Sequence, residues 1–445
     1  MSQKVICDPV HGHIYIDLVK EQLILKLLCS REIQRLRRIH QLGVSYLTYP
    51  GAEHSRFSHA LGTFHLTKLA LKYLGENEDR YFDDNERIAV LAAGLLHDIG
   101  HGPFSHVLEK DYGIHHEAWT EKLIVSKESE VNSILRNYNR GLPRRIIKLL
   151  FEPAKEFSLF NALLSSQLDV DRMDYLLRDS YFCGNSYGKF DYMWILHTMK
   201  IGKLKLGRSQ IEQPMWTTKA VRAIEDYIFA RHNMYWTVYY HPATRGYEVL
   251  LKTILDRAKF LAEKGRDVSF LSTSLKNFVI KPERMKYKDF IALDDAVLLA
   301  QVSIWRRSRN KILSDLCRRL LDRDGLKWVD FREDKSQVLN RRAREIAEAQ
   351  IKVELKKKKY NPSYYLLDSV SAAKAYDYYH FERGSDLQTA KNSIFILDKD
   401  DTPTEISSRK EMQGLKAITG EQETKKFYYV PIECRRSVNK ILDKM

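Results

Sequence analysis

Cysteine is scarce in this chain, and the few cysteines follow no recognisable pattern. Five occur among 445 residues, and none of them forms a CxxC pair. Their scatter excludes a disulfide framework and a zinc–thiolate site, and it suits a reducing compartment. The five cysteines are Cys7, Cys29, Cys183, Cys317 and Cys434.

Long apolar runs are also missing. No run approaches the roughly 20 residues that a membrane-spanning helix needs, and the first nine residues contain no apolar stretch typical of a secretory signal. We therefore expect neither export nor a membrane span, and we predict a cytoplasmic protein. Internal repeats and low-complexity segments are absent as well, which leaves an ordinary globular composition.

What the chain has in excess is positive charge. The formal net charge is +15, and 44% of the residues are apolar, which is enough for a sizeable core. Such a balance favours polyanionic partners, namely nucleotides, nucleic acid or acidic lipid headgroups, without choosing among them. The length predicts one large domain and one smaller domain.

Helical periodicity dominates up to about residue 350, and strand-like runs follow residue 362. We expect a mainly α fold, with a helical core over 1–335 and a smaller α+β region over 336–445. The pattern predicts one helix from Phe160 to Leu177 and a polar loop from Gly75 to Asp84. It also predicts a strand around Ile14 and Ile16, a hairpin over 201–214, and strands near 393–397 and 427–430.

The most informative stretch is Leu95 to His106, where three histidines and an aspartate follow an apolar run. Imidazole and carboxylate are the usual ligands of borderline and hard divalent metals. Neighbours on a straight helix diverge by about 100°. His97 and Asp98 can therefore share an ion only where Gly100 and Gly102 break the helix.

Further ligands must come from elsewhere in the chain. Asp171 belongs to an acidic cluster in an otherwise apolar helix, where unpaired carboxylates are costly unless a cation or arginines offset them. His59 follows Arg56, which suits a site that also holds an anion. We predict a site for a divalent metal such as Mg, Mn, Fe or Zn, with open positions for water and phosphate. Its ligands are His59, His97, Asp98 and Asp171.

Several neighbouring residues have simpler interpretations. His11 and His13 suit turn and packing positions, and Asp169 and Asp174 suit structural pairing with basic groups. Lys356 to Lys359 is interpreted as a solvated helix face, and the aromatic run 376–381 as core or subunit interface. The remaining histidines His101, His106 and His116 are available for proton transfer and phosphate contacts, because imidazole titrates near neutrality.

The order His59, His97-Asp98, Asp171 resembles the HD phosphohydrolase superfamily, over a metal-binding segment of about 50–180. Longer strings narrow the resemblance to the deoxynucleoside triphosphate (dNTP) triphosphohydrolases of bacterial and vertebrate SAM-and-HD-domain type, over roughly residues 5–250. These strings are Asp8-Pro9-Val10-His11-Gly12-His13, Gln34-Arg35-Leu36-Arg37, Gln41-Leu42-Gly43, Pro50-Gly51-Ala52, the run from His97 to His106, and Asp169-Val170-Asp171-Arg172-Met173-Asp174-Tyr175.

The resemblance implies cleavage at the α-phosphorus, giving a deoxynucleoside and inorganic triphosphate. It assigns His106 to protonation of the leaving 5′-oxygen or to a position in line with it, Glu109 to orienting that histidine, and His101 and His116 to the phosphates. The implied substrate contacts fall into three groups: Arg56, Arg172 and Arg231 for the triphosphate; Gln41, Tyr175 and Asp179 for the sugar; Tyr239 and His241 near the base. The packing of Tyr175 under the 2′ position would disfavour ribonucleotides.

Some members of the resembled family are tetramers activated by nucleotides at interface sites. Val5 and Arg37 agree with that effector pattern, and we expect a homotetramer with a possible nucleotide effector. Cys7 and Cys29 depart from the pattern where the vertebrate enzyme has an asparagine and a guanine-reading aspartate. This departure argues against guanine-specific activation and leaves another effector open.

Two other functions remain as alternatives. The first is an HD-type phosphodiesterase or nucleotidase for cyclic or alarmone nucleotides; Tyr175, Asp179 and Arg231 argue against it, because they suit deoxyribose and triphosphate. The second is a nucleic-acid-binding protein with a vestigial site, suggested by the net charge. The complete ligand set and the lack of a recognition-helix or RNA-binding signature weigh against it.

Overall fold

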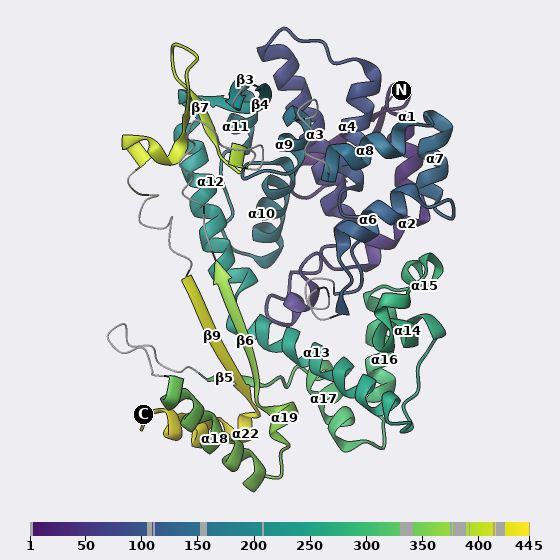
Figure 1. Ribbon diagram of the computed structural model, residues 1–445, viewed down its shortest axis with the longest axis vertical. Coiled ribbons are helices and arrows are strands. Elements are labelled where there is room, and N and C mark those ends of the chain that lie inside the picture. Colours follow the sequence, from purple (N-terminus) through teal and green to yellow (C-terminus); the bar gives the residue numbers. More distant parts are fainter. Residues whose placement is uncertain are drawn as a thin grey trace.

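The computed structural model describes residues 3–104, 109, 112–151, 158–206, 209–329, 341–373, 376, 389–390, 392–412, 414 and 423–444. Within this part the molecule is elongated, with the N-terminal helices at one end and the C-terminal elements around α18 and α22 at the other (Figure 1). No helix in the described ranges combines the length and apolar character needed to cross a bilayer.

The first half of the chain is a helical bundle preceded by a small hairpin. Its elements are β1 (Gln3–Asp8), β2 (Gly12–Asp17), α1 (Gln22–Leu28), α2 (Arg31–Arg35), η1 (Leu36–Arg38), η2 (Gly43–Leu47), α3 (Arg56–Asn77), α4 (Asp84–Leu96), α6 (His116–Val125), α7 (Glu130–Tyr138), α8 (Leu142–Phe151), α9 (Ser158–Leu164), α10 (Val170–Cys183) and α11 (Tyr192–His197). Helix α4 is buried along most of its length, and α3, α8 and α9 pack against it. This apolar helix carries His97 and Asp98 at its C-terminal end.

The second half mixes helices with short strands. Its elements are β3 (Met199–Leu206), β4 (Ser209–Thr217), η4 (Thr218–Ala220), α12 (Val221–Met234), the π-helix η5 (Tyr235–Tyr239), α13 (Pro242–Glu263), α14 (Thr273–Ile280), η6 (Pro282–Arg284), α15 (Tyr287–Ile291), α16 (Asp295–Trp305), α17 (Lys311–Leu321), β5 (Lys327–Val329), α18 (Arg341–Lys357), α19 (Pro362–Tyr365), β6 (Leu367–Ala373), β7 (Phe395–Leu397), β8 (Pro403–Glu405), η7 (Ile406–Ser408), η8 (Lys410–Met412), β9 (Glu423–Val430) and α22 (Ile432–Leu442).

Three separate sheets accompany the helices in the described part of the chain. The strand orders are β1-β2, β3-β4-β7-β8 and β5-β9-β6. Strands β3 and β4 form the hairpin after α11, and the parallel pairing of β4 with β7 joins this hairpin to the C-terminal region. In the third sheet, β5 and β6 both pair antiparallel with β9. A large buried core includes residues from Ile14 to Val438, and a small separate cluster lies within the β3-β4-β7-β8 sheet region. The mainly α fold with small C-terminal sheets is therefore confirmed.

Two predicted elements differ from the structure. Helix α3 continues to Asn77, into the segment expected to be a loop. The predicted helix over 160–177 is wrong, because it is divided into α9 and α10. Asp169 causes the division: its side chain accepts a hydrogen bond from the Arg172 backbone N–H, as an N-cap residue does at the start of a helix.

Some predictions fall on parts of the chain outside the described ranges. The boundary at 335 lies within 330–340, and His106 lies within 105–108. Of the aromatic run 376–381, only Tyr376 is described; it is buried, and its hydroxyl donates to Glu405. Lys356 to Lys359 are exposed at the end of α18, which agrees with a solvated face.

Candidate metal centre

Four side chains from three helices converge on one point. His59 lies in the second turn of α3, His97 and Asp98 follow α4, and Asp171 lies in the first turn of α10. Asp171 Oδ1 is 3.0 Å from His59 Nε2 and 3.4 Å from His97 Nε2. Asp98 Oδ1 lies 3.5 Å from His97 Nε2. The fold thus brings together all four predicted ligands.

The two imidazole rings are held with their Nε2 atoms toward this point. His59 Nδ1 is 2.7 Å from a carboxylate oxygen of Asp174, and His97 Nδ1 is 2.9 Å from the carbonyl oxygen of Gly94. A proton on Nδ1 serves both acceptors, so each ring can offer its Nε2 lone pair to a metal that displaces any proton there. Among the described residues, neither buried Nε2 has a hydrogen-bond partner of good geometry. His59, His97 and Asp98 form a group that could hold a metal ion, and Asp171 lies beside both histidines.

Charge interactions in the cluster are strong. Burial alone would lower the pKa of His59, but hydrogen bonds with Asp171 and Asp174 raise that pKa to about 10. Burial alone would raise the pKa of Asp171, but the two histidines hold it well below its usual range. The carboxylates therefore remain ionised, and their negative charge favours any cation at this point.

The position of Asp171 corrects one sequence-based expectation. We expected this residue in the middle of a helix, but the break at Asp169 places it in a first turn. Its side chain keeps 30% of its surface exposed, whereas Asp174 in the next turn is fully buried. The cluster is therefore partly open to solvent on the side of Asp171.

A second group of side chains extends the cluster through Asp98. Arg56 Nη1 donates to Asp98 Oδ2 at 2.7 Å, and His101 Nε2 lies 3.3 Å from Asp98 Oδ1. The ring of His101 stacks on that of His116, with centroids 4.2 Å apart. His116 Nδ1 in turn lies 2.5 Å from Glu109 Oε1. Three of the four predicted catalytic residues, His101, Glu109 and His116, are thus adjacent. The fourth, His106, lies outside the described ranges, so its predicted contact with Glu109 stays a prediction.

The stacked side chains of His101 and His116 differ in how readily they bind a proton. Burial and the nearby charge of Arg56 hold the pKa of His101 well below its usual range. Burial alone would also lower the pKa of His116, but its hydrogen bond with Glu109 raises that pKa. One ring is therefore neutral, while the other carries a proton more readily, which suits contact with an anion.

The predicted sugar-binding residues form a separate group two turns along α10. Asp179 accepts from His54 Nε2 at 2.7 Å and from the Tyr239 hydroxyl at 2.8 Å. The ring of Tyr175 meets that of Tyr239 edge to face, with centroids 6.1 Å apart. The backbone N–H of Gln41 donates to the carbonyl of His54, and its side-chain oxygen is buried without a partner among the described residues.

Arg231 and Arg172, two of the predicted triphosphate contacts, have different partners in the structure. Arg231 Nη1 donates to Gln167 Oε1 at 2.6 Å, and its guanidinium lies 5.7 Å from the centre of the Tyr235 ring. Arg172 is tied to Asp169, the pairing expected for that aspartate. Burial alone would raise the pKa of Tyr235, but the charges of Arg231 and Arg172 lower it. Both arginines therefore create a positive potential around this tyrosine.

The remaining predicted residues lie farther from the cluster. His241 caps α13 by accepting from the Ala243 N–H, and burial lowers its pKa. Val5 faces Tyr15 across the β1-β2 hairpin and is 47% exposed. Arg37 lies over the ring of Phe57, 3.6 Å from its centre. The effector role of Val5 and Arg37 stays a prediction.

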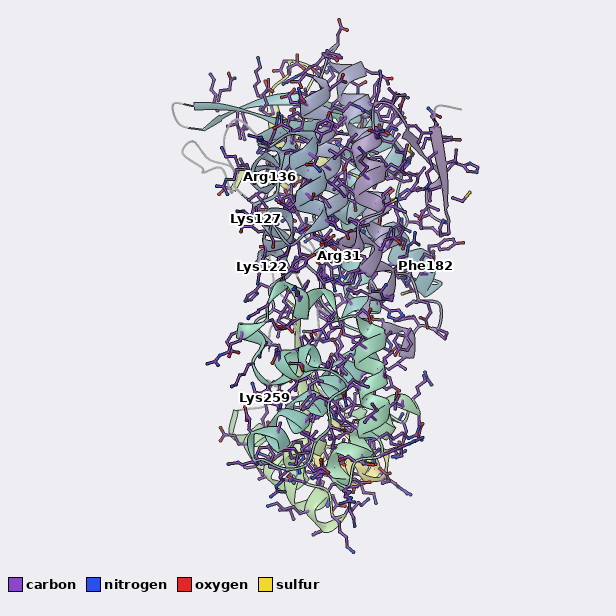
Figure 2. All side chains as sticks on the ribbon, turned by 90° about the vertical axis from the view of Figure 1, so that its right-hand side faces the viewer. Arg31, Lys122, Lys127, Arg136, Phe182 and Lys259 are labelled. Atoms are coloured by element: carbon purple, nitrogen blue, oxygen red, sulfur yellow. The ribbon has the colours of Figure 1, made fainter. Side chains whose placement is uncertain are left out.

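Sequence reasoning missed several contacts of the site. Asp174 and His11 had been assigned structural roles, yet both belong to a network that reaches His59. His54 and Tyr235 had no assigned role, although His54 holds Asp179 and stacks on Phe182. In Figure 2, Phe182 lies across the molecule from Lys122 and Lys127. The strings that contain His11 and Asp174 were the only sequence signal for them.

Comparison with known proteins agrees with this geometry. The HD-domain family profile matches residues 56–179, which contain all four candidate ligands. The protein YwfO of Bacillus subtilis is 36% identical over 430 residues, covering 97% of this chain and 92% of that protein. The crystal structure of a phosphohydrolase from Bacteroides thetaiotaomicron superposes with a TM-score of 0.78 at 30% identity, covering 96% of this chain and 99% of the other.

A more distant relative has a specific name. The zebrafish deoxynucleoside triphosphate triphosphohydrolase SAMHD1 is 28% identical over 281 residues, which cover 56% of this chain and 44% of that enzyme. The full-length similarity to YwfO and to the Bacteroides enzyme, together with the match of the HD profile to the metal cluster, defines the family. The chain belongs to the HD-domain phosphohydrolase family.

Proposed function

We propose that this protein hydrolyses dNTPs to deoxynucleosides and inorganic triphosphate, with a divalent metal held by His59, His97, Asp98 and Asp171. Such a metal, when bound, polarises phosphoryl oxygens and lowers the pKa of a coordinated water. The metal is Mg, Mn, Fe or Zn. The chain's own residues then have to bind the triphosphate, recognise the sugar and deliver a proton to the leaving oxygen.

One observation carries the choice of substrate. Asp171, Tyr175 and Asp179 follow each other at intervals of four on α10, so they lie along one face of the helix. This face extends about 12 Å, at 1.5 Å per residue. It begins at the metal cluster and ends at the carboxylate held by His54 and Tyr239. A ligand with phosphate at one end and a hydroxylated sugar at the other matches that order.

The sugar contacts follow from the available donors and acceptors. The Asp179 carboxylate and the unpartnered Gln41 oxygen are both acceptors, which suits a 3′-hydroxyl donor. The Tyr175 ring occupies the space beside them and excludes a 2′-hydroxyl sterically. Tyr239 and His241 lie toward the base.

The side chains that contact the phosphates carry a positive charge or can gain one by binding a proton. Arg56, Arg231 and Arg172 supply fixed positive charge, and His116 gains a proton readily beside Glu109. Neutral His101 donates a hydrogen bond without adding charge. His106 protonates the leaving 5′-oxygen, oriented by Glu109. A homotetramer and a nucleotide effector near Val5 and Arg37 belong to the same proposal.

The test is product analysis on purified protein. Each dNTP, each ribonucleotide, and a panel of cyclic and alarmone nucleotides are incubated with Mn²⁺, and the products are separated by ion-exchange chromatography. We expect a deoxynucleoside and intact triphosphate from dNTPs. Orthophosphate with a diphosphate, or turnover of a cyclic or alarmone nucleotide alone, would contradict the proposal and favour another HD hydrolase.

Two variants link the activity to the site. Asp98→Asn removes a ligand charge and should abolish hydrolysis. Asp368→Asn changes an aspartate that is half exposed on β6 and should have no effect. Assays with paired dNTPs, with the mass of the active particle measured alongside, test the effector and the tetramer. Salt-dependent binding of single-stranded DNA or RNA without dNTP turnover would instead support the nucleic-acid-binding alternative.

A further inference from the structure

The N-terminal hairpin makes a buried polar contact with the core beneath the metal cluster. The turn between β1 and β2 places Asp8 and His11 against α10. His11 Nε2 lies 2.6 Å from Asp174 Oδ1, and both side chains are completely buried. This contact joins two residues that are 163 positions apart in the sequence.

Asp174 receives four hydrogen bonds that fix its carboxylate. Oδ2 accepts from His59 Nδ1 at 2.7 Å and from Arg178 Nε at 2.9 Å. Oδ1 accepts from His11 at 2.6 Å and from Arg178 Nη2 at 2.9 Å. Because each oxygen has two donors, the carboxylate cannot rotate without breaking several bonds. The ring of His59, which depends on Oδ2, is held equally firmly.

Asp8 completes the network on the far side. Its carboxylate accepts from Arg178 Nη1 at 2.8 Å and also from the backbone N–H groups of Val10 and His11 in the turn. The side chains of Asp8, Asp174 and Arg178 together carry one net negative charge when His11 is neutral. A buried negative charge behind His59 strengthens the electron donation of its Nε2 toward a cation.

Several other contacts join the hairpin to the core: the carbonyl of Tyr15 accepts from Lys68 Nζ at 2.9 Å, and Ile6 packs against the core. Ile14 and Ile16 of β2 are fully buried in the core, while Val5 and Tyr15 form a cross-strand pair that is about half exposed. A two-stranded hairpin has marginal stability on its own. Its docking therefore depends on these contacts with the core and on the network around Asp174.

We propose that the N-terminal hairpin is part of the metal site: His11 is a positioning residue that sets the His59 ring through Asp174, so that hairpin docking and metal binding are thermodynamically coupled. The inference rests on the proposed metal site. Coupling of this kind is reciprocal, so an event that lifts the hairpin weakens metal binding, and metal binding tightens the hairpin. Outer partners of metal-bound histidines typically contribute 10–100-fold to metal affinity.

The first experiment measures metal affinity without any substrate. Metal-free full-length protein is titrated with Co²⁺, whose visible absorbance reports coordination. His11→Leu removes the donor at similar volume and should weaken Co²⁺ binding, by at most the roughly 10–100-fold that loss of a direct partner of the histidine costs. His11→Gln keeps an N–H donor and should recover much of the affinity. His13→Leu is the matched control, because this exposed side chain lies on the same hairpin.

The outcomes separate this inference from the metal site itself. Absence of Co²⁺ binding to the wild-type protein would contradict the metal site. Binding to the wild type with unchanged affinity in His11→Leu would overturn the positioning role alone, as would equal losses in His11→Leu and His13→Leu.

The second experiment remains informative if His11→Leu folds poorly. Hydrogen exchange of the wild-type protein is compared with and without Co²⁺. Coupling predicts slower exchange over residues 3–17 when the metal is bound, and unchanged exchange in the β3-β4 hairpin, which serves as an internal reference. Exchange over 3–17 that does not respond to the metal, or equal slowing in both hairpins, would overturn the coupling.

Discussion

His59 Nε2 and Asp171 Oδ1 lie 3.0 Å apart, although they belong to α3 and α10, which are far apart in the sequence. Asp171 Oδ1 also lies 3.4 Å from His97 Nε2, so one carboxylate oxygen faces both imidazole rings. The atoms that would bind a metal therefore already face one another, and the pair is oriented for a cation.

Asp171→Asn should remove metal binding while preserving the shape of the cluster. The amide keeps the volume but loses the charge that balances a divalent ion. We expect the metal affinity to fall more than about 100-fold, beyond the 10–100-fold typical of an outer partner, and dNTP hydrolysis to be lost. Metal analysis and chromatographic assays check this; a fully metal-loaded variant would show that Asp171 is not a ligand.

Asp179→Asn should affect the substrate but not the metal. Hydrogen bonds to charged groups contribute about 1.5–3 kcal/mol, and each 1.4 kcal/mol corresponds to tenfold, so kcat/KM for dNTPs should fall about 10–100-fold. Tyr239→Phe removes one donor to the carboxylate and should have a smaller effect. Unchanged Co²⁺ affinity is the control. Loss of metal from Asp179→Asn would mean that the two sites are not separate.

Tyr175→Leu should relax discrimination against ribonucleotides, because it removes the ring proposed to fill the 2′ position. We expect the ratio of kcat/KM values for a ribonucleotide and its deoxy counterpart to rise about tenfold, the scale of steric discrimination in a pocket. Tyr181→Leu changes an exposed tyrosine of the same helix and should leave the ratio unaltered. Equal ratios in wild type and Tyr175→Leu would exclude this tyrosine from sugar selection.

Gly62→Ala should destabilise the fold beneath the metal site. A Cβ atom at this position of α3 would lie 1.8 Å from Asp174 Oδ1 and 2.5 Å from Arg178 Nη2. Overpacking typically costs about 1–3 kcal/mol, and here it would also displace the carboxylate that holds His59. Urea unfolding and Co²⁺ titration should both show a loss. Gly141→Ala, which lies in an exposed turn with no contact closer than 3.4 Å, is the control.

His40 should make stability depend on pH. Burial alone would lower its pKa, but contacts with Asp295 at 2.7 Å and Glu53 at 2.9 Å raise it above the ordinary value of 6.5. A raised pKa in the folded state stabilises the protein fully below about pH 6.5, and this contribution is lost as the pH rises through the folded-state pKa.

The measurement is urea unfolding of wild type and His40→Gln between pH 5.5 and 9, a range chosen around the ordinary histidine pKa of about 6.5. The difference in unfolding free energy should be largest at the acidic end and should shrink as the pH rises. A difference that stays constant over the range would show that His40 does not gain a proton in the fold.

Much of the site could be predicted from the sequence because its chemistry is local. His97 and Asp98 are neighbours at the end of an apolar helix, and His59 and Asp171 stand out as polar groups in apolar surroundings. The helix break before Asp171 was missed, although Asp169 is a good N-cap residue. Apolar periodicity on both sides of the break concealed it. Strands β5 and β6 were missed because they are stabilised by pairing with β9, which is distant in sequence.

The sequence by itself determined the residue types, the helical class and the identity of the candidate ligands, because each follows from local periodicity and from side-chain chemistry. Only the tertiary structure decided which nitrogen of His59 faces the metal position, since that depends on Asp174, and Asp174 depends on Arg178 and on His11 of the hairpin. A hydrogen-bond network of this kind has no periodic signature, because its members meet only when separate elements pack together.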